Sequence, residues 1–219
     1  MGTVIGDLLP LAVGVAISPI PIVAIILVIL SDRAASSGTG FAVGWVAGIA
    51  LGTTIVVLLA GGFTGTGDQE PSPAVAWTKI VLGVLLVVLA ASQWRGRSDD
   101  TTPRWMQAID ELTPVKALGL GAVLAVVNPK NLLLCVSAGV AIGTSGLGAG
   151  GKTGAVVIFT VLAAATVLAV VLGYLLAADR LRGTLGRARN WLQANNHAVL
   201  AIVLLVMGTV VLGKGIGGL

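Results

Sequence analysis

The sequence Asn128-Pro129-Lys130-Asn131 places one lysine deep in a long apolar stretch. An ammonium group near the middle of a spanning helix costs about 2.5–3.5 kcal/mol on insertion scales. Lys130 is roughly a dozen residues, or about 18 Å along a helix, from either end of its stretch. Lysines near helix ends snorkel to the interface over only about 6 Å. Leucine would stabilise a purely structural helix better here, so the pattern predicts a binding site at mid-membrane.

A second proline motif, Ser18-Pro19-Ile20-Pro21, lies in the first apolar stretch. Serine and asparagine are good N-cap residues, and proline suits the first position of a helix. Each motif therefore predicts a helix that breaks inside the membrane and restarts as a half-helix. The positive ends of the two half-helices would favour an anion. The candidate substrate-binding residues are Ser18, Pro19, Pro21, Asn128, Pro129, Lys130 and Asn131.

The prolines also affect the backbone that precedes each break. A proline leaves the carbonyl four residues earlier without its helical donor, which predicts free carbonyl oxygens at Val15, Ile17 and Ala125. Water, the Lys130 ammonium or a cation could use these oxygens. A single proline in a spanning helix is commonly a simple kink, so the predicted site rests on the two matched breaks and the lysine together.

The composition indicates which class of protein positions these residues. Of 219 residues, 56% are hydrophobic and 10% are charged, and the mean hydropathy is +1.02. A soluble domain of this size does not sustain such values. A hydrocarbon core of about 30 Å needs about 20 helical residues. Six stretches are long enough, which predicts an all-α polytopic membrane protein with spans near 8–30, 40–62, 74–93, 116–142, 154–177 and 196–214.

Lysine and arginine indicate the orientation of the six spans. The loops after the first, third and fifth spans share one side, which carries nine basic residues against three on the other side. The nine are Arg33, Arg95, Arg97, Arg104, Lys116, Arg180, Arg182, Arg187 and Arg189, and the three are Lys79, Lys152 and Lys214. Basic loops stay in the cytoplasm, so we expect a multi-pass protein of the plasma (inner) membrane with the N- and C-termini outside. The net charge of +4 reports this topology and contact with anionic lipids, not nucleic acid.

Two loops on the basic side have the pattern of short amphipathic helices. One would begin at Thr102, and the other carries Leu181, Leu185 and Leu192 among arginines. Basic amphipathic segments lie along anionic headgroups. A plain positive-inside anchor explains them equally well.

The two proline motifs divide the chain into similar halves. Pro19 and Pro129 are 110 positions apart, half the length of the protein. Because each half has three spans, the second half must enter the membrane upside down. Inverted repeats with broken helices at corresponding positions indicate a transporter site at the midplane. We predict a single transmembrane domain over 1–219, with a first three-helix repeat at 1–94, a cytoplasmic connecting loop at 95–115 and a second three-helix repeat at 116–219.

Small and hydroxylated residues mark further helix faces. Glycine recurs at every fourth position from Gly40 to Gly52, which gives a smooth face for close packing inside a bundle or, less often, for a dimer. Four threonines are weaker candidates for the lining of a path, because threonine in a spanning helix commonly bonds its own backbone. They are Thr53, Thr54, Thr160 and Thr166.

Motifs of enzymes and metal sites fail on their context. Residues 146–153 match the phosphate-loop pattern GxxxxGK[ST], but that motif needs a preceding strand and a soluble α/β domain. Cys135 and His197 are each the only residue of their kind, and the nine acidic residues all lie in loops or at helix ends. No buried cluster is therefore predicted that could hold a metal or relay protons. We expect a protein that is not an enzyme and has no cofactor.

The residues around the breaks also carry a family resemblance. The run SPIPIVAIILVILSDRAASSGTGFAVGW, with NPKNLLL about 110 residues later, resembles the lysine-exporter (LysE) superfamily of six-helix transporters. Within it, the chain is similar to the actinobacterial GAP family of glycopeptidolipid and sulfolipid-1 addressing proteins. Supporting segments are Trp94-Arg95, Pro103-Arg104-Trp105-Met106, Ile109-Asp110 and Trp191-Leu192. The resemblance covers essentially the whole chain and implies export, or assistance in export, of a cell-envelope glycolipid or peptidoglycolipid.

Departures from the wider superfamily narrow the range of substrates that we expect. Its redox branch uses paired intramembrane cysteines, whereas Cys135 is alone. Its amino-acid exporters typically have glycine between the first-helix prolines and then an acidic or amide residue, whereas Ile20 and Ile22 stand here. Two alternatives stay open: export of a small solute (amino acid or ion), and a non-transporting adaptor of a larger lipid exporter. Expected partners are membrane lipids, the amphiphilic substrate and, from the resemblance and the glycine repeat, a second copy in a homodimer.

Overall fold

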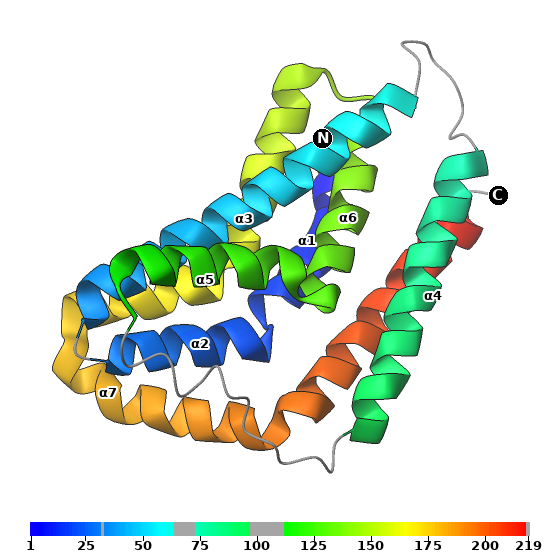
Figure 1. Ribbon diagram of the computed structural model, residues 1–219. Helices are drawn as coiled ribbons and strands as arrows, with labels where there is room; N and C mark the ends of the chain where they lie inside the picture. Colours follow the sequence, from blue (N-terminus) through cyan, green and yellow to red (C-terminus); the bar gives the residue numbers. More distant parts are fainter. Residues whose placement is uncertain (32, 64–72, 97–111, 218–219) are drawn as a thin grey trace.

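The computed structural model describes residues 1–31, 33–63, 73–96 and 112–217 (Figure 1). The regular elements in these ranges are α-helices, and no strand occurs in them, which confirms the predicted all-α class. The helices are α1 (Gly2–Ala16), α2 (Pro19–Leu30), α3 (Ala34–Phe63), α4 (Pro73–Arg95), α5 (Pro114–Val127), α6 (Pro129–Gly143) and α7 (Ala149–Ile216). The predicted amphipathic helix that begins at Thr102 lies outside the described residues.

Several of these helices are long and apolar enough to cross a membrane. Four single stretches qualify, namely Ala34–Gly61, Ala76–Arg95, Ala149–Ala177 and His197–Ile216. Two bent pairs also qualify when each is taken together: α1 with α2, bent by 51°, and α5 with α6, bent by 69°. The described chain is therefore a membrane protein with four spanning helices, or up to six if each bent pair is one span. The bends confirm the predicted breaks in the first and fourth apolar stretches.

The helices extend beyond the apolar spans that the sequence predicts. α1 begins at Gly2 and α3 at Ala34, each six residues before the predicted spans at 8 and 40. Hydropathy detects only the part of a helix that suits hydrocarbon, whereas helical hydrogen bonds continue into the polar turns beyond it. The 68-residue α7 joins the last two predicted spans through helical residues 178–196, with a bend at the non-helical Ala177 (φ −153°, ψ 51°). A helix after the fifth span, as predicted, is thus confirmed.

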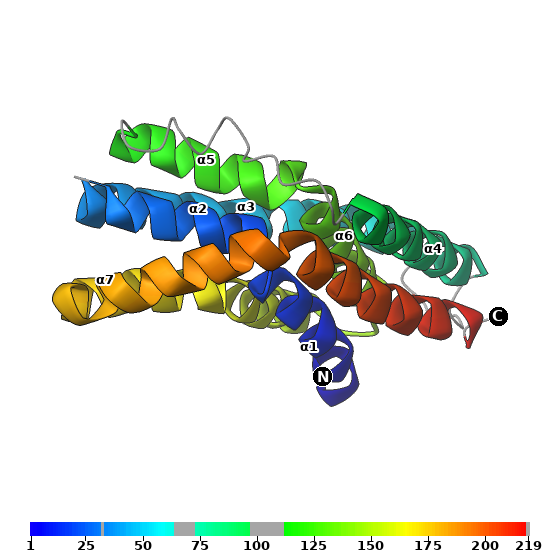
Figure 2. The same cartoon turned by 90° about the horizontal axis from the view of Figure 1, so that it is seen from below.

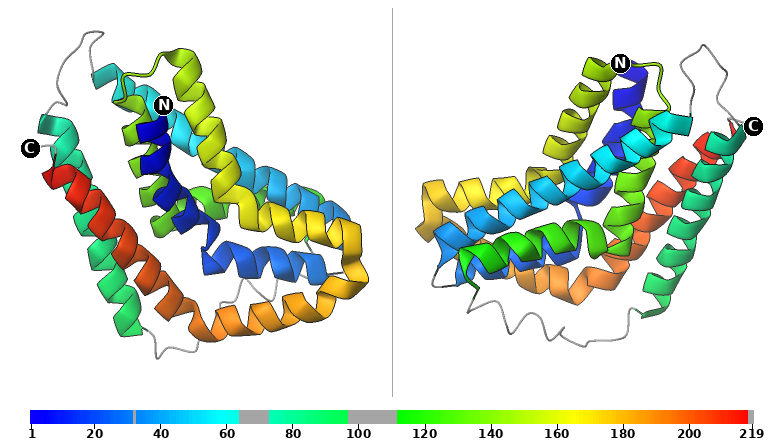
Figure 3. Two further views of the ribbon diagram at one scale, coloured as in Figure 1. Left: turned by 180° about the vertical axis from the view of Figure 1, so that it is seen from behind. Right: turned by 45° about the horizontal axis from the view of Figure 1, so that its top comes forward.

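The two bends lie side by side in the middle of the molecule. Figures 1 and 3 show the α1–α2 break next to the α5–α6 break, and α1 contacts α6 while α2 contacts α5. Both termini, the start of α4 and the turn between α6 and α7 lie at one end of the molecule. The ends of α2 and α4 and the start of α5 lie toward the opposite side. Which of these ends face the cytoplasm stays a prediction.

α2 is enclosed by other helices. Figure 2 shows it between α5 and α7, and it also contacts α3. Its sequence, PIPIVAIILVIL, is apolar on every face, which is typical of a fully buried helix. Nine of its twelve residues are buried. The first proline motif therefore begins a core helix.

The glycine face of α3 packs against α5. A methyl group added at Gly40 or Gly44 would collide with the backbone carbonyls of Pro114 and Leu118. Close approach of this kind is what small residues allow in membrane helices, and it confirms the predicted packing inside the bundle. Because α5 covers this face, a homodimer or a larger exporter would need another surface, and both partners stay predictions.

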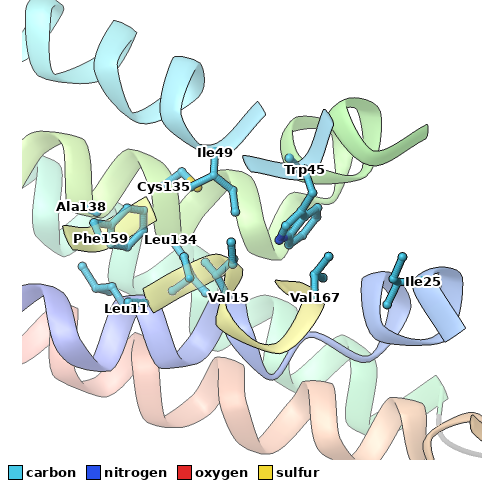
Figure 4. Packing of buried hydrophobic residues seen from close by; sticks show 14 of the residues in the cluster. Leu11, Val15, Ile25, Trp45, Ile49, Leu134, Cys135, Ala138, Phe159 and Val167 are labelled. Atoms are coloured by element: carbon cyan, nitrogen blue, oxygen red, sulfur yellow. The ribbon is translucent and has the colours of Figure 1, made fainter. Parts of the chain in front are cut away.

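The hydrophobic core lies around the two breaks. Figure 4 shows Trp45 and Ile49 of α3 packed among Val15 of α1, Leu134 of α6 and Val167 of α7. All five residues are buried and belong to one cluster. The core thus packs against one side of the broken backbone, whereas Ile17, Val126 and Val127 beside the breaks are exposed.

Candidate functional site

The α5–α6 break is built as the sequence predicts. Asn128 has extended backbone angles (φ −66°, ψ 113°), and Pro129 is the first residue of α6. The backbone N–H of Lys130 donates to Asn128 Oδ1 at 3.2 Å, and the N–H of Leu132 donates to the Asn128 carbonyl at 2.9 Å. Asn128 is therefore the side-chain N-cap of α6, which begins directly after the break.

The α1–α2 break differs in its hydrogen bonds. Ser18 is extended (φ −70°, ψ 116°) and precedes Pro19, but its side chain makes no cap bond. Its hydroxyl is fully buried and has no hydrogen-bond partner in the described part of the chain. Ser18 is thus at the N-cap position without acting as a side-chain cap.

The predicted free carbonyl at Val15 is wrong. The backbone N–H of Ser18 donates to the Val15 carbonyl at 3.0 Å, and the N–H of Ile17 donates to the Val13 carbonyl at 3.0 Å. The chain closes the end of α1 with its own turn, so the N–H of Ser18, one position before Pro19, replaces the N–H that Pro19 lacks. Helix ends are often satisfied by such tighter turns.

Lys130 is buried at the start of α6. Only 2% of the residue is exposed, and its Nζ has no hydrogen-bond partner among the described residues. The neighbouring Asn131 is fully buried, and neither its Oδ1 nor its Nδ2 has a partner. Buried polar groups are nearly always hydrogen-bonded, and a buried charge without a partner is costly. The three unpaired polar atoms of these two adjacent residues form a polar centre that packing alone does not explain.

Four more buried side-chain atoms have no hydrogen-bond partner among the described residues: Asn128 Nδ2, Trp45 Nε1 and Thr53 Oγ1 of α3, and Thr160 Oγ1 of α7. The sequence analysis did not single out Trp45, because a tryptophan in an apolar stretch is ordinarily assigned to the hydrophobic core. Of the four threonines proposed for a path, Thr53 and Thr160 are buried. The other two, Thr54 and Thr166, are half-buried.

The electrostatics of the centre favour an anion. Among the side chains that the structure describes, the one carboxylate is Asp7, and it is paired with Lys214 near the termini. Lys130 therefore has no described counter-charge beside it. The N-terminal end of α6 adds the partial positive charge of its free N–H groups. Lys130 and Asn131 can together present an ammonium group and an amide N–H to one bound anion.

The start of α2 contributes less to such a site. Pro19 and Pro21 both lack an N–H and stand in the first turn, so few backbone donors remain there. The N–H of Ile22 already donates to the Ser18 carbonyl at 3.4 Å. The predicted residues Pro19 and Pro21 shape this end as buried apolar surface, and Ser18 supplies its one polar side chain.

The phosphate-loop pattern has a structural explanation. Lys152 lies in the first turns of α7, and its Nζ donates to the Gly143 carbonyl at the end of α6 at 2.6 Å. Cations suit the carbonyl end of a helix. The lysine thus ties α7 to α6, and no strand precedes it in the described residues.

His197, Cys135 and the acidic residues show no catalytic arrangement in the described parts of the chain. His197 Nδ1 lies 3.0 Å from Gln93 Oε1 and so links α7 to α4. Cys135 is a free, buried thiol. No group of three His, Cys, Asp or Glu side chains that could hold a metal ion occurs among the described residues.

Comparison with known proteins identifies one family. The family model described as "Sap, sulfolipid-1-addressing protein" matches residues 8–217. The match spans both breaks and nearly the whole chain. No curated protein and no solved structure matches.

Proposed function

The chain belongs to the family of sulfolipid-1-addressing proteins, and we propose that it exports, or assists the export of, an amphiphilic lipid of the cell envelope. Membership confirms the resemblance to the GAP family. The family name indicates a role in addressing or exporting sulfolipid-1. We propose a glycolipid or peptidoglycolipid as the substrate class of this chain. The wider LysE superfamily is consistent with this assignment and stays a prediction.

One observation carries the proposal of a mid-membrane site. Lys130 is buried at the break between α5 and α6, and its ammonium has no partner in the described residues. Ionisable residues at this depth mark substrate pathways more often than they stabilise a fold. We assign Lys130, Asn131 and Asn128 to an anionic or polar headgroup. Ser18 lies in the α1–α2 break, Pro19 and Pro21 stand in the first turn of α2, and Pro129 begins α6.

The mechanism we propose is alternating access. The headgroup enters the polar centre while the hydrocarbon tail stays in the surrounding lipid, and the substrate leaves chemically unchanged. The two three-helix repeats would rock against one another around the breaks, as in transporters with broken helices at the midplane. The nearly complete burial of Lys130 supports a closed conformation of such a cycle. The basic loops would face the cytoplasm and both termini the outside of an actinobacterial plasma membrane.

Two alternatives are less well supported. A small-solute exporter with familiar proton coupling would need an intramembrane carboxylate, and the acidic residues of the sequence lie outside its six long apolar stretches. An adaptor for a larger lipid exporter could not use the glycine face of α3, because α5 covers it. The adaptor could still dock through the basic side.

The test compares surface-extractable lipids with total envelope lipids in a deletion strain. Wild type, Lys130→Ala and the control Lys116→Ala would be expressed in that strain, since Lys116 is exposed at the start of α5. We expect one lipid class to disappear from the surface and accumulate inside. Wild type and Lys116→Ala should restore it, and Lys130→Ala should not. Unchanged lipids in the deletion strain would refute lipid export and favour small-solute export.

A further inference from the structure

A partly enclosed pocket lies near the end of the molecule where the termini are found. Four helices line it: α1, α4, α6 and α7. Its residues are Asp7, Leu11, Lys79, Ser137, Ala141, Val210, Val211 and Lys214. We call it the outer pocket, because the predicted topology places this end outside.

The outer pocket is charged on one part and apolar on another. Lys214 Nζ donates to Asp7 Oδ1 at 2.6 Å, and these side chains are 35% and 48% exposed. Lys79 brings a second ammonium from α4, and no ion pair to it occurs among the described residues. The three ionised groups sum to one net positive charge. Leu11, Val210 and Val211 supply apolar wall beside them.

Two residues of the outer pocket share one face of α6 with Lys130 of the mid-membrane site. On α6, Ser137 and Ala141 of the pocket follow Lys130 at intervals of seven and eleven residues, which places all three on one helix face. The distance from Lys130 to Ser137 along the helix axis is about 10.5 Å. Asp7 and Leu11 of the pocket lie on α1, which ends at Ala16 just before Ser18.

A hydrophobic plug separates the two sites. Between them, a methyl group added at Gly14 of α1 would lie 3.0 Å from Leu134 Cδ1 and 3.1 Å from Met207 Cγ. Leu134 stands one turn after Lys130 on the same face of α6, and Met207 stands one turn before Val211 on α7. Leu134 and Met207 therefore close over Gly14 midway between the polar centre and the outer pocket.

We propose that the outer pocket is a second anion-binding site, which holds the anionic headgroup of an amphiphile after it has passed Lys130. The place of this site on an export route rests on the proposed function, whereas its ability to bind an anion does not. Lys79 contacts the headgroup directly. Lys214 is shared between the headgroup and Asp7, so binding competes with the ion pair. The apolar wall takes the first methylene groups of the tail, which distinguishes an amphiphile from a free inorganic anion.

The test measures binding by calorimetry to the purified full-length chain in nanodiscs of uncharged phosphatidylcholine. The probes are hexyl phosphate, which has a phosphate head and a short tail, and inorganic phosphate. Every variant carries Lys130→Ala, so that the mid-membrane site does not contribute. Against this background, adding Lys79→Ala should weaken hexyl phosphate binding about tenfold, since hydrogen bonds to charged groups are roughly twice as strong as neutral ones. The matched control, adding Lys116→Ala, should leave it unchanged.

Asp7→Asn gives an effect of opposite sign. Removal of the competing carboxylate frees Lys214, so hexyl phosphate should bind several-fold more tightly, whereas a purely structural ion pair would only weaken the site when broken. Equal binding in the Lys79→Ala variant and its background would overturn the outer site. Equal affinity for inorganic phosphate would overturn its assignment to an amphiphile. Either failure leaves the lipid-export test intact, and a failure of lipid export with binding preserved would refute only the proposed function.

Discussion

The break between α1 and α2 and the break between α5 and α6 share a proline at the first helical position but differ in what surrounds it. Asn128 caps α6 with its own side chain, whereas the Ser18 hydroxyl makes no cap bond at α2. The α6 start carries Lys130 and Asn131, both buried and polar. The α2 start carries two prolines and continues as an apolar core helix.

This difference indicates a division of labour between the two half-helices. The α6 end concentrates the charge and the hydrogen-bond donors, so it is the part that would hold a substrate. The α2 end has few donors and many branched side chains in contact with α3, α5 and α7. The start of α2 would therefore form a rigid apolar surface opposite the start of α6, which would bind the substrate. Matched sequence motifs in the two halves of a chain therefore need not have matched roles.

The largest expected effect comes from reversing the charge at the start of α6. Lys130→Glu reverses the charge at the proposed anion site, so export of the lipid should be abolished. The measurement is the surface lipid fraction in the complemented deletion strain, with membrane levels of the variant checked by immunoblot. Lys116→Glu is the matched control, because it makes the same change on an exposed residue. Normal export with Lys130→Glu would show that the α6 end does not bind an anion.

A second substitution at the same position separates function from folding. Lys130→Leu removes a buried group without a partner and should stabilise the protein by about 2 kcal/mol or more, given the insertion cost of a central lysine. Export should nevertheless be lost. Thermal unfolding in nanodiscs measures the first effect and surface lipid the second. A variant that is both less stable and inactive would assign Lys130 to the fold.

The next prediction concerns how α5, the helix that precedes the second break, is anchored. α5 is clamped by α3, because a methyl group at Gly121 would collide with the Phe41 carbonyl, whereas one at Gly119 would meet nothing within 4 Å. Gly121→Ala should therefore destabilise the protein by about 1–3 kcal/mol through overpacking. Gly119→Ala, two residues away in the same helix, should stabilise it by up to about 1 kcal/mol through helix propensity. Thermal unfolding of the two variants tests the clamp, which is wrong if they shift the midpoint equally.

The sequence predicted the breaks because their signals are local. A cap residue followed by proline acts within one turn, and hydropathy over about 20 residues is enough to recognise a span. The internal packing of the Gly40–Gly52 face followed from residue size in the same way. The all-α class and both bends therefore needed no knowledge of the tertiary structure.

Features that depend on contacts between distant segments were predicted less well. The Val15 carbonyl is bonded by the Ser18 N–H because the chain turns there, and a proline rule for straight helices cannot include that turn. The unpaired indole of Trp45 and the convergence of Asp7, Lys79 and Lys214 in the outer pocket arise from packing of separate helices. No spacing within the sequence carries that information.

The smallest expected effect tests the difference between the two caps directly. Asn128→Ala removes the side-chain acceptor of the Lys130 N–H and should destabilise the protein by about 1 kcal/mol, the usual effect of losing an N-cap. Ser18→Ala removes a buried hydroxyl that has no partner, so it should be neutral or stabilise the protein by up to about 1 kcal/mol. Both are read from thermal unfolding in the same nanodiscs.

The sign of the Ser18→Ala effect decides between two descriptions of the breaks. If the substitution is as destabilising as Asn128→Ala, the Ser18 hydroxyl does cap α2 and the two half-helices are equivalent. If stability is unchanged but export falls, the hydroxyl contacts the substrate, because a group that bonds nothing within the protein can influence export only through what passes it. The second result would mean that the start of α2 contacts the substrate through the Ser18 hydroxyl alone, while the start of α6 supplies the charge.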